Sequence, residues 1–563
     1  MPNGNSSTLT LFGVRDIDAG KYTVIVSNAA NSATSAPATL TVLQPTLNGE
    51  PFTWSSLMAS TCGGTLSALS TDPAGNIYLA ATQPNIPLPG LTNASGCGSG
   101  FALARLDADG RGVWRNLAGG ASGLFANVAR VQPDGAGNLL VVGTFKGTMT
   151  FGPFGGVGPS VDSLGRANLF LAKYNPTGTL LWIKMATSAG ASDLVMDAAG
   201  NSYIAGTLPG SASTTPVQST FGTINVSTVS RRTFLAKADP AGDFIWVRTA
   251  GAKTTGATST IVALDPSGDL WLAGLFYGTL EYGTNLFTSV FPPPNNLAQR
   301  FSAFLTRLDQ DGQPRWTRMY QAKSQINSVL RVGAHPAGGA LLALGNSGAI
   351  DYPPVTTLDY NGTIVMRLDA DGVPISGFFI ENPVKDVAMN RFGSVLLAAE
   401  VGGDTFGGFK LPRPNGQNIA AMLRLKPDLT PDLARSVSGL KGLEHAIPDR
   451  LALGENGDAV FAGTFVGTNV VFGPLVSRAT FASGSFLAKL GAPALPAIRG
   501  QFSAGKLTLT WPSNGNWVLE RVQTLGGTFA PVTYASHTNS DSSILVELPT
   551  TEQNTAFFRL RQQ

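Results

Sequence analysis

Apolar and polar residues alternate along most of the chain in short runs, separated by turns rich in Gly, Asp, Asn and Pro. Successive side chains of a β-strand point to opposite faces, so alternation with a period of two indicates strands with one buried face. The chain has no long stretch with apolar residues at helical spacing. The pattern therefore predicts an all-β protein.

Two short motifs recur in turn between residues 50 and 490. Copies of F-x-A-K/R-x-D-x-x-G-x-x-x-W begin at Phe101, Phe170, Phe234 and Phe304, with weaker copies at Ile364 and Ala421 and a truncated one at Phe486. The second motif, D-x-x-G-N/D-x-x-x-A-G-T, precedes each of these, with its turn glycine at Gly75, Gly137, Gly200, Gly268, Gly338, Gly393 and Gly457. In both motifs two alternating runs flank a turn where Asp or Pro precedes Gly, a sequence typical of a β-hairpin.

Two hairpins per repeat predict seven four-stranded units. The last copy stops at Leu490 without its final strand, while an orphan strand of that kind, Phe52–Leu57, stands before the first unit. We expect the orphan strand to complete the seventh unit and close a ring, as blades do in propellers. The repeats predict a seven-bladed β-propeller over residues 50–491. They resemble the seven-bladed β-propeller repeat family of bacterial extracellular proteins, and this resemblance implies an extracellular location.

The segments on either side of the repeats resemble other β-modules. Around Tyr22, the run DAGKYTV resembles the tyrosine corner of immunoglobulin-like domains, so residues 1–44 are interpreted as the C-terminal part of such a domain. We expect its missing strands and a signal peptide upstream. After a Pro-rich linker, the runs LTLTW and FFRLR within residues 497–563 resemble a fibronectin type III-like module, which predicts a small β-sandwich.

Five tryptophans occupy one position of the first motif. They are Trp54, Trp114, Trp182, Trp246 and Trp316. A periodic aromatic residue is typical of a core position, so we predict packing between blades rather than a ligand platform. Ser376 and Leu433 take this position in the two weaker copies, which predicts looser packing there. The string also resembles the tryptophan-docking motif of pyrroloquinoline-quinone dehydrogenases, but it is one residue shorter and no cofactor-site signature accompanies it, so no cofactor is expected.

Charge excludes some classes of partner. Of 563 residues, 38 are Lys or Arg and 35 are Asp or Glu, giving a formal charge of +3. Nucleic-acid binders usually carry a marked basic excess, which this chain lacks. No apolar run approaches the roughly 18 residues that indicate a membrane span. We therefore expect neither nucleic-acid binding nor direct insertion into a membrane.

The two cysteines, Cys62 and Cys97, fall in the connection entering the first blade and in the loop between its hairpins. Propeller topology places these two connections on one face. A disulfide between them is the favoured prediction, in keeping with an extracellular protein, and two free thiols are the alternative.

The loops between the two hairpins of a blade are long and lie on the same face. The longest span residues 82–100, 144–168, 207–233 and 275–303. Several contain a G-T-x-x-F/Y-G echo, which favours a regular excursion of each blade over individually shaped binding loops.

Candidate catalytic residues are few. Glu400, Asp404, Glu444 and His445 are expected on the loop-rich face, but their spacing does not indicate convergence, so solvated loop charges are favoured. Three histidines in separate segments cannot form a three-histidine metal centre, and the D-x-D-G turns lack the further ligands of a calcium loop, so no metal is expected.

These observations favour a non-catalytic extracellular or cell-surface protein that uses a propeller face for binding or adhesion to a glycan or a protein. The alternative is a secreted propeller enzyme, a hydrolase or lyase acting on polysaccharide or glycan. A third possibility is a rigid spacer.

Overall fold

The computed structural model places most of the repeat region and part of each flanking segment, and the chain divides into two compact units, residues 1–491 and 492–563. The described residues are 20–23, 25–27, 32–40, 52–59, 65–82, 99–120, 124–152, 158–211, 215–251, 257–282, 285–288, 301–352, 355–356, 361–403, 405–411, 416–440, 442–455, 457–472, 475–479, 483–490, 499–503, 506–512, 517–522, 530–531, 537–540, 543–549 and 557–562. None of them is helical, so the prediction of an all-β protein is confirmed.

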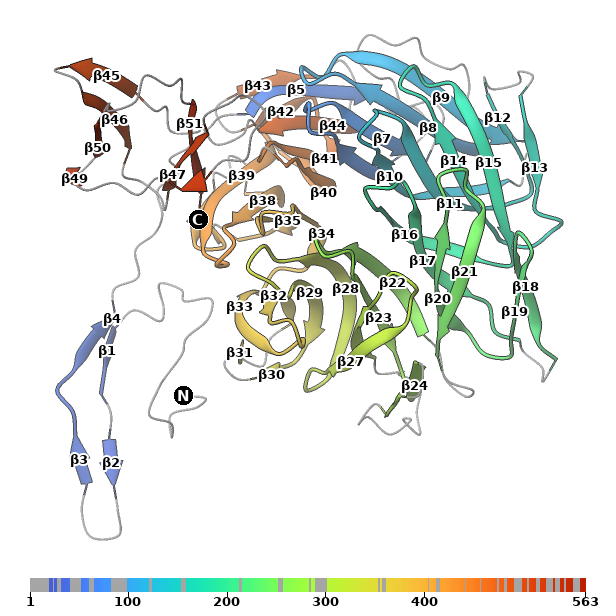
Figure 1. Ribbon diagram of the computed structural model, residues 1–563, viewed down its shortest axis with the longest axis horizontal. Coiled ribbons are helices and arrows are strands. Elements are labelled where there is room, and N and C mark those ends of the chain that lie inside the picture. The colour runs from blue at the N-terminus through green and yellow to red at the C-terminus, as the bar shows by residue number, and fades with distance from the viewer. Residues whose placement is uncertain are drawn as a thin grey trace. The chain divides into compact units, whose positions relative to one another are not determined.

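Seven antiparallel four-stranded blades form the propeller (Figure 1). Blade 1 contains β6 (Leu66–Thr71), β7 (Ile77–Ala81), β8 (Ser99–Leu106) and β9 (Gly112–Gly120). Blade 2 contains β10 (Phe125–Pro133), β11 (Leu139–Lys146), β14 (Asn168–Tyr174) and β15 (Leu180–Thr187). Blade 3 contains β16 (Gly190–Met196), β17 (Ser202–Leu208), β20 (Arg232–Ala238) and β21 (Phe244–Ala250).

The remaining blades repeat this order. Blade 4 contains β22 (Ala257–Leu264), β23 (Leu270–Phe276), β26 (Ser302–Leu308) and β27 (Pro314–Tyr320). Blade 5 contains β28 (Gln325–Ala334), β29 (Ala340–Ser347), β32 (Gly362–Leu368) and β33 (Pro374–Ile380). Blade 6 contains β34 (Val384–Met389), β35 (Val395–Val401), β38 (Ile419–Leu425) and β39 (Pro431–Gly439). Blade 7 contains β40 (His445–Leu453), β41 (Ala459–Val466), β44 (Ser483–Leu490) and β5 (Phe52–Ala59).

Ring closure follows the predicted arrangement. Strand β5, from the start of the repeat region, pairs antiparallel with β44 from its end, with Trp54 opposite Lys489. Two segments more than 400 residues apart in sequence thus share one sheet. The seven-bladed propeller closed by an N-terminal strand is confirmed, and closure removes the open edges that would invite aggregation.

The excursions between hairpins are short β-ribbons that extend the blade before them. Ribbon β12 (Thr148–Phe151)–β13 (Ser160–Asp162) of blade 2 pairs with β9 of blade 1, and β18 (Val217–Phe221)–β19 (Ile224–Thr228) of blade 3 pairs with β15. Ribbon β42 (Asn469–Phe472)–β43 (Leu475–Arg478) of blade 7 pairs with β39. The regular excursion predicted from the sequence echo is confirmed, and these ribbons cover outer strand edges.

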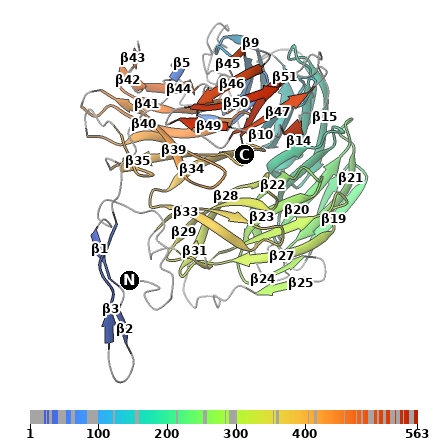
Figure 2. The same ribbon diagram turned by 60° about the vertical axis from the view of Figure 1, so that its left-hand side comes forward.

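Blades 4, 5 and 6 carry shorter ribbons at the corresponding point of the sequence. They are β24 (Thr279–Tyr282)–β25 (Asn285–Thr288), β30 (Asp351–Tyr352)–β31 (Val355–Thr356) and β36 (Thr405–Phe406)–β37 (Phe409–Lys410). In both ribbon views β22, β23 and β27 of blade 4 follow one another outward, with β24 at the outer edge (Figures 1 and 2).

The core lies between neighbouring blades, because both faces of each sheet are covered. Second and third strands are buried along nearly their whole length, as in β23, where every residue is buried. The motif phenylalanine packs across its strand pair on the glycine of A-G-T, and a Cβ added to Gly206 would lie 2.6 Å from the Phe234 ring. In the two motifs the large phenylalanine is thus paired with glycine, the smallest residue, which leaves room for the ring.

The flanking segments form small sheets of their own. In the first, β1 (Gly20–Tyr22) pairs with β4 (Ala38–Leu40) and β2 (Ile25–Ser27) with β3 (Ser32–Thr34). In the second unit, β45 (Arg499–Ser503), β46 (Lys506–Pro512), β50 (Ser543–Pro549) and β49 (His537–Ser540) make one sheet, and β48 (Ala530–Pro531), β47 (Trp517–Val522) and β51 (Phe557–Gln562) another. The immunoglobulin-like and fibronectin-like assignments stay predictions. Over the described part of the chain no helix has the length and apolar character needed to cross a membrane.

Candidate binding site at the propeller axis

The five repeat tryptophans lie at the seams between blades. Each packs on the glycine in the turn between the third and fourth strands of the next blade, where an added Cβ would lie 2.5–2.8 Å from the indole. The pairs are Trp54 with Gly110, Trp114 with Gly178, Trp182 with Gly242, Trp246 with Gly312 and Trp316 with Gly372. In this structure the tryptophans are therefore packing residues.

At three seams the Lys or Arg of the first motif and the tryptophan donate to the same turn carbonyl, an interaction that the sequence did not predict. Trp54 Nε1 and Lys489 Nζ both donate to the Ala108 carbonyl, at 3.1 and 3.2 Å. At two other seams an arginine and a tryptophan again share one turn carbonyl, Arg105 and Trp114 on Pro176, and Arg307 and Trp316 on Ala370. The available signal was the K/R that recurs in all seven copies of the motif.

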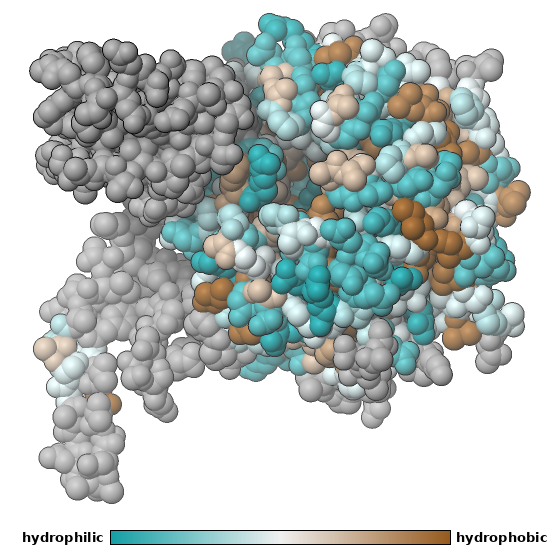
Figure 3. Space-filling view, in the orientation of Figure 1, coloured by the Kyte–Doolittle hydropathy of each residue, from teal (hydrophilic) through white to brown (hydrophobic). Residues whose placement is uncertain are grey.

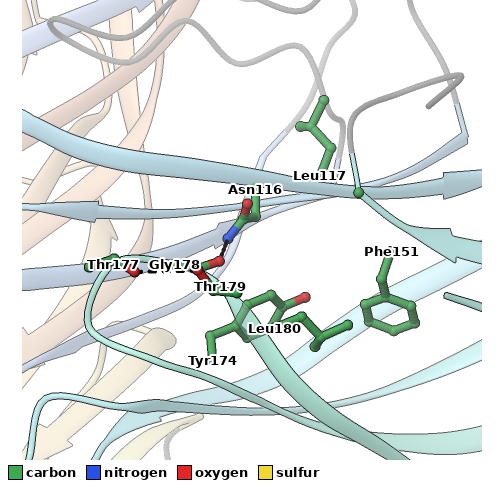
Figure 4. A pocket seen from close by; sticks show the side chains of 9 residues that line it. Asn116, Leu117, Phe151, Tyr174, Thr177, Gly178, Thr179 and Leu180 are labelled. Carbon is green, nitrogen blue, oxygen red and sulfur yellow. Dashed lines mark hydrogen bonds between the residues drawn. The ribbon is translucent and has the colours of Figure 1, made fainter. Parts of the chain in front are cut away.

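A cavity of about 310 Å³ lies at the outer seam between blades 1 and 2 (Figure 4). Asn116, Phe151, Tyr174 and Leu180 line it, together with the turn that contains Gly178, and the Asn116 amide donates to the Gly178 carbonyl. Burial raises the pKa of the Tyr174 hydroxyl above its ordinary value. None of the described residues that line this cavity has a charged side chain, so they offer no ion-pair partner to a charged ligand.

Glu444 has a structural role. Its carboxylate accepts backbone N–H bonds from Thr468 at 2.9 Å and Asn469 at 3.2 Å in the ribbon of blade 7, and from Leu440 at 3.0 Å after β39. These bonds tie the ribbon to the blade whose edge it covers. A carboxylate occupied by three backbone amides is poorly placed to exchange protons with a substrate.

The other catalytic candidates have separate partners. Glu400 accepts a hydrogen bond from the Asn418 amide at 2.9 Å, and His445 Nδ1 lies 3.0 Å from the Leu443 carbonyl. Asp404 lies outside the described residues, as do Cys62 and Cys97, whose disulfide stays a prediction.

The first strands of the blades surround the propeller axis (Figure 1). Charged side chains on several of these strands lie close together. Every first strand contains a β-bulge. Beyond the bulge, each first strand has one residue that pairs with the second-strand residue preceding the motif glycine or its equivalent. From blade 1 to blade 7 this position holds Ala68, Arg130, Asp193, Ile261, Arg331, Asp386 and Arg450. We name its five charged members, Arg130, Asp193, Arg331, Asp386 and Arg450, the axial charge cluster.

Asp193 joins blades that are not neighbours. Its Oδ1 lies 3.5 Å from Arg130 Nε of blade 2, and its Oδ2 lies 3.8 Å from Arg331 Nη1 of blade 5. Asp193 itself belongs to blade 3, so these side chains meet across the axis and not only along a seam.

Both cluster carboxylates also hold the next blade. Asp193 Oδ2 accepts a bond from the Val262 amide at 3.1 Å, and Asp386 Oδ2 accepts one from the Leu451 amide at 2.8 Å. Val262 and Leu451 occupy the same position of their blades. Arg450, at the cluster position of blade 7, donates hydrogen bonds instead of accepting them. Its guanidinium donates to the Ser67 and Asp449 carbonyls, both at 2.7 Å.

The cluster carries a positive excess of three guanidiniums over two carboxylates. Burial, together with the charges of Arg331 and Arg450, lowers the pKa of Arg130 to about 10, against the opposing charges of Asp193 and Asp386. Water still reaches the site, because 26% of the Arg130 side chain and 17% of the Arg331 side chain are exposed. On the face seen in Figure 3 the surface over β28 and β34 is mostly hydrophilic.

A further acid lies beside the cluster. Burial raises the pKa of Asp449 to about 6, against the opposing charges of Arg450 and Lys385. Asp449 Oδ2 is buried without a hydrogen-bond partner among the described residues. Perturbed acids of this kind are frequent at functional sites.

The sequence did not predict this cluster, although a signal was present. Aligning the seven first strands on the turn that follows them would have placed Arg or Asp at one shared position in five of them.

Comparisons with known proteins assign this chain neither a family nor a function. No protein-family model matches the chain, and no curated protein matches it. Solved structures with which it shares similarity include a protein of unknown function from Dyadobacter fermentans, at 10% identity and a TM-score of 0.35, covering 78% of this chain and 98% of that one. Another is the α-L-arabinofuranosidase of Fusarium graminearum in complex with arabinobiose, at 9% identity and a TM-score of 0.33, covering 67% and 96%. A third is a neuraminidase-like protein of A/flat-faced bat/Peru, at 8% identity and a TM-score of 0.28, covering 79% and 98%. Such TM-scores carry no argument about site or activity.

Proposed function

We propose that this chain is a non-catalytic binding protein, extracellular or on a cell surface, whose propeller engages a glycan or a protein. The observation that supports this best is the axial charge cluster, where side chains of five blades converge. Three of its five charges are guanidiniums, which bind oxyanions well but stay protonated and so serve poorly as acids or bases. The extracellular location rests on the resemblance of the repeats.

A glycan array followed by a turnover assay on every glycan that binds would test this proposal. We expect binding of the full chain without product formation. Turnover that is lost in Glu400→Gln and retained in the exposed control Glu281→Gln would contradict it, because Glu400 would then take part in chemistry.

The second candidate function is that of an enzyme acting on polysaccharide or glycan, and Asp449 is the residue that favours it. A buried carboxyl with a pKa of about 6 is suited to donate or accept a proton near neutral pH. Product formation by the wild type that disappears in Asp449→Asn, with glycan binding retained, would favour this candidate over binding alone.

A further inference from the structure

We propose that the axial charge cluster binds the carboxylate group of an acidic glycan, with Arg130 and Arg331 as the principal ligands. This inference rests on the proposed binding function and adds to it the chemical class of the ligand. Three features of the described residues carry it: the convergence across the axis, the unused hydrogen-bond donors and the charge of the cluster.

The donors of Arg130 and Arg331 are largely unused. Among the described residues Arg130 Nε is buried without a hydrogen-bond partner, and the acidic oxygen that pairs with it, on Asp193, lies 3.5 Å away. The Arg331 guanidinium forms no hydrogen bond with a described residue, and its Nη1 pairs only with Asp193 Oδ2 among the described carboxylates, at 3.8 Å. A guanidinium has five N–H donors, and leaving them unsatisfied in a largely buried place is costly.

Arg450 differs, because two backbone carbonyls already accept from it at 2.7 Å. It is therefore positioned as a fixed positive charge at the edge of the site. Arg130 and Arg331 come from blades 2 and 5 and both face Asp193, so a ligand that contacts both arginines would share them with this carboxylate.

The charge of the cluster selects a singly charged anion. Three guanidiniums and two carboxylates leave one positive charge, and the neighbouring Lys385 and Asp449 cancel each other when both are ionised. A carboxylate balances that charge, whereas a phosphate monoester carries about −1.5 to −2 at neutral pH. The planar guanidinium fork can also bind the two coplanar oxygens of a carboxylate through two parallel N–H···O bonds.

The test is an array of uronate- and sialate-bearing glycans beside the same glycans with their carboxyl groups reduced to alcohols, and sulfated glycans as a separate arm. We expect an acidic glycan to bind at least about tenfold more tightly than its reduced form. Equal binding of the two forms would overturn the inference while leaving the proposed binding function intact. Stronger binding of the sulfated arm would overturn the assignment to carboxylate.

Two variants and a matched control localise the effect. Arg331→Gln should weaken acidic-glycan binding about tenfold or more, and Arg331→Lys should fall between it and the wild type, because the charge is kept and the fork is lost. Arg111→Gln removes an equal charge from a side chain that is 76% exposed and should bind like the wild type. Wild-type binding by a folded Arg331→Gln protein would overturn the inference.

A measurement on the wild type alone covers the case in which the variants do not fold. Millimolar sodium glucuronate should raise the melting temperature relative to glucose plus sodium chloride at equal ionic strength, because a ligand of the native state stabilises it. If no glycan binds and glucuronate leaves the melting temperature unchanged, both the inference and the glycan-binding form of the proposed function are wrong.

Discussion

A single histidine replaces a missing tryptophan at the seam between blades 5 and 6. Ser376 stands where other blades place the tryptophan, and His335 Nε2 lies 3.1 Å from the Pro427 carbonyl, the same turn position that tryptophans contact elsewhere. His335 Nδ1 accepts a bond from the Ala337 amide, so Nε2 carries the proton in the neutral ring and donates to Pro427. The sequence predicted looser packing here and did not reveal this substitute.

The burial of His335 makes part of the stability dependent on pH. Burial lowers the pKa of His335 below its ordinary value of 6.5, so the folded state favours the neutral ring. The contribution is present in full above the unfolded-state pKa and is lost as pH falls through that value toward the folded-state pKa. His335→Asn keeps a turn acceptor, as Asn390 does in blade 6, and removes the titration. Denaturant midpoints at pH 7.5 and 5.5 should therefore differ less for the variant than for the wild type; an equal difference would contradict the prediction.

Asp449 has the opposite effect on the pH dependence of stability, because it destabilises the fold as pH rises. Its folded-state pKa of about 6 exceeds the ordinary value of 3.8, so the fold disfavours the ionised form. The penalty is absent below about pH 4, grows as pH rises and is complete above about pH 6. Asp449→Asn should stabilise the protein by about 1–2 kcal/mol at pH 7.5 and by little at pH 4. Asp109→Asn, at an exposed turn, should change the unfolding free energy by less than about 0.5 kcal/mol at either pH.

At the scale of the strand and turn, the tryptophan needs a turn to pack on, and this explains its loss in blade 6. Leu433 occupies the position there, and the next blade, blade 7, has no turn between its third and fourth strands, because β44 and β5 come from opposite ends of the repeat region. Leu433 is instead buried in an apolar cluster with Phe52 and Phe472. The replacement of tryptophan by leucine in blade 6 thus has a geometric cause.

The packing of tryptophan on turn glycine can be measured with a pair of glycines. Gly178 has φ 86° and faces Trp114, whereas Gly165 has φ 80° and open space around it. Alanine costs about 1–2 kcal/mol at either position for the left-handed backbone, and the clash with the indole adds about 1–3 kcal/mol at Gly178. Thermal unfolding should therefore show Gly178→Ala to be clearly less stable than Gly165→Ala. Equal losses of stability in the two variants would mean that the tryptophan moves aside without an energetic cost.

At the scale of the whole molecule, the sequence predicted what depends on local signals. Turn residues and period-two alternation determine each hairpin, and counting the hairpins yields the seven blades and the closing strand. The axial charge cluster could not be predicted in this way, since Arg130 and Arg331 lie about 200 residues apart and meet only when the ring closes. The shared carbonyl of cation and tryptophan also escaped prediction, because its donors and its acceptor belong to different blades.

Closure makes one seam different from the others. Between blades 7 and 1 the buried Lys489 bridges Asp458 at 2.9 Å and the carbonyls of Gly75 and Ala108, opposite Trp54 of the closing strand. Lys489→Met removes the ammonium partner of Asp458 and the bonds that hold blade 1, at a cost of about 3 kcal/mol or more.

Lys237→Met changes the same motif position within a continuous stretch of chain, where the lysine lies 5.2 Å from the Tyr203 ring and forms no ion pair with a described residue, so its cost should be about 1 kcal/mol. Calorimetry should rank the two variants in this order. Limited proteolysis should cut before β6 faster in Lys489→Met than in Lys237→Met, because only there can the ring open by releasing a terminal strand. Equal melting temperatures and equal cleavage rates would show that the closing seam is no weaker than the others.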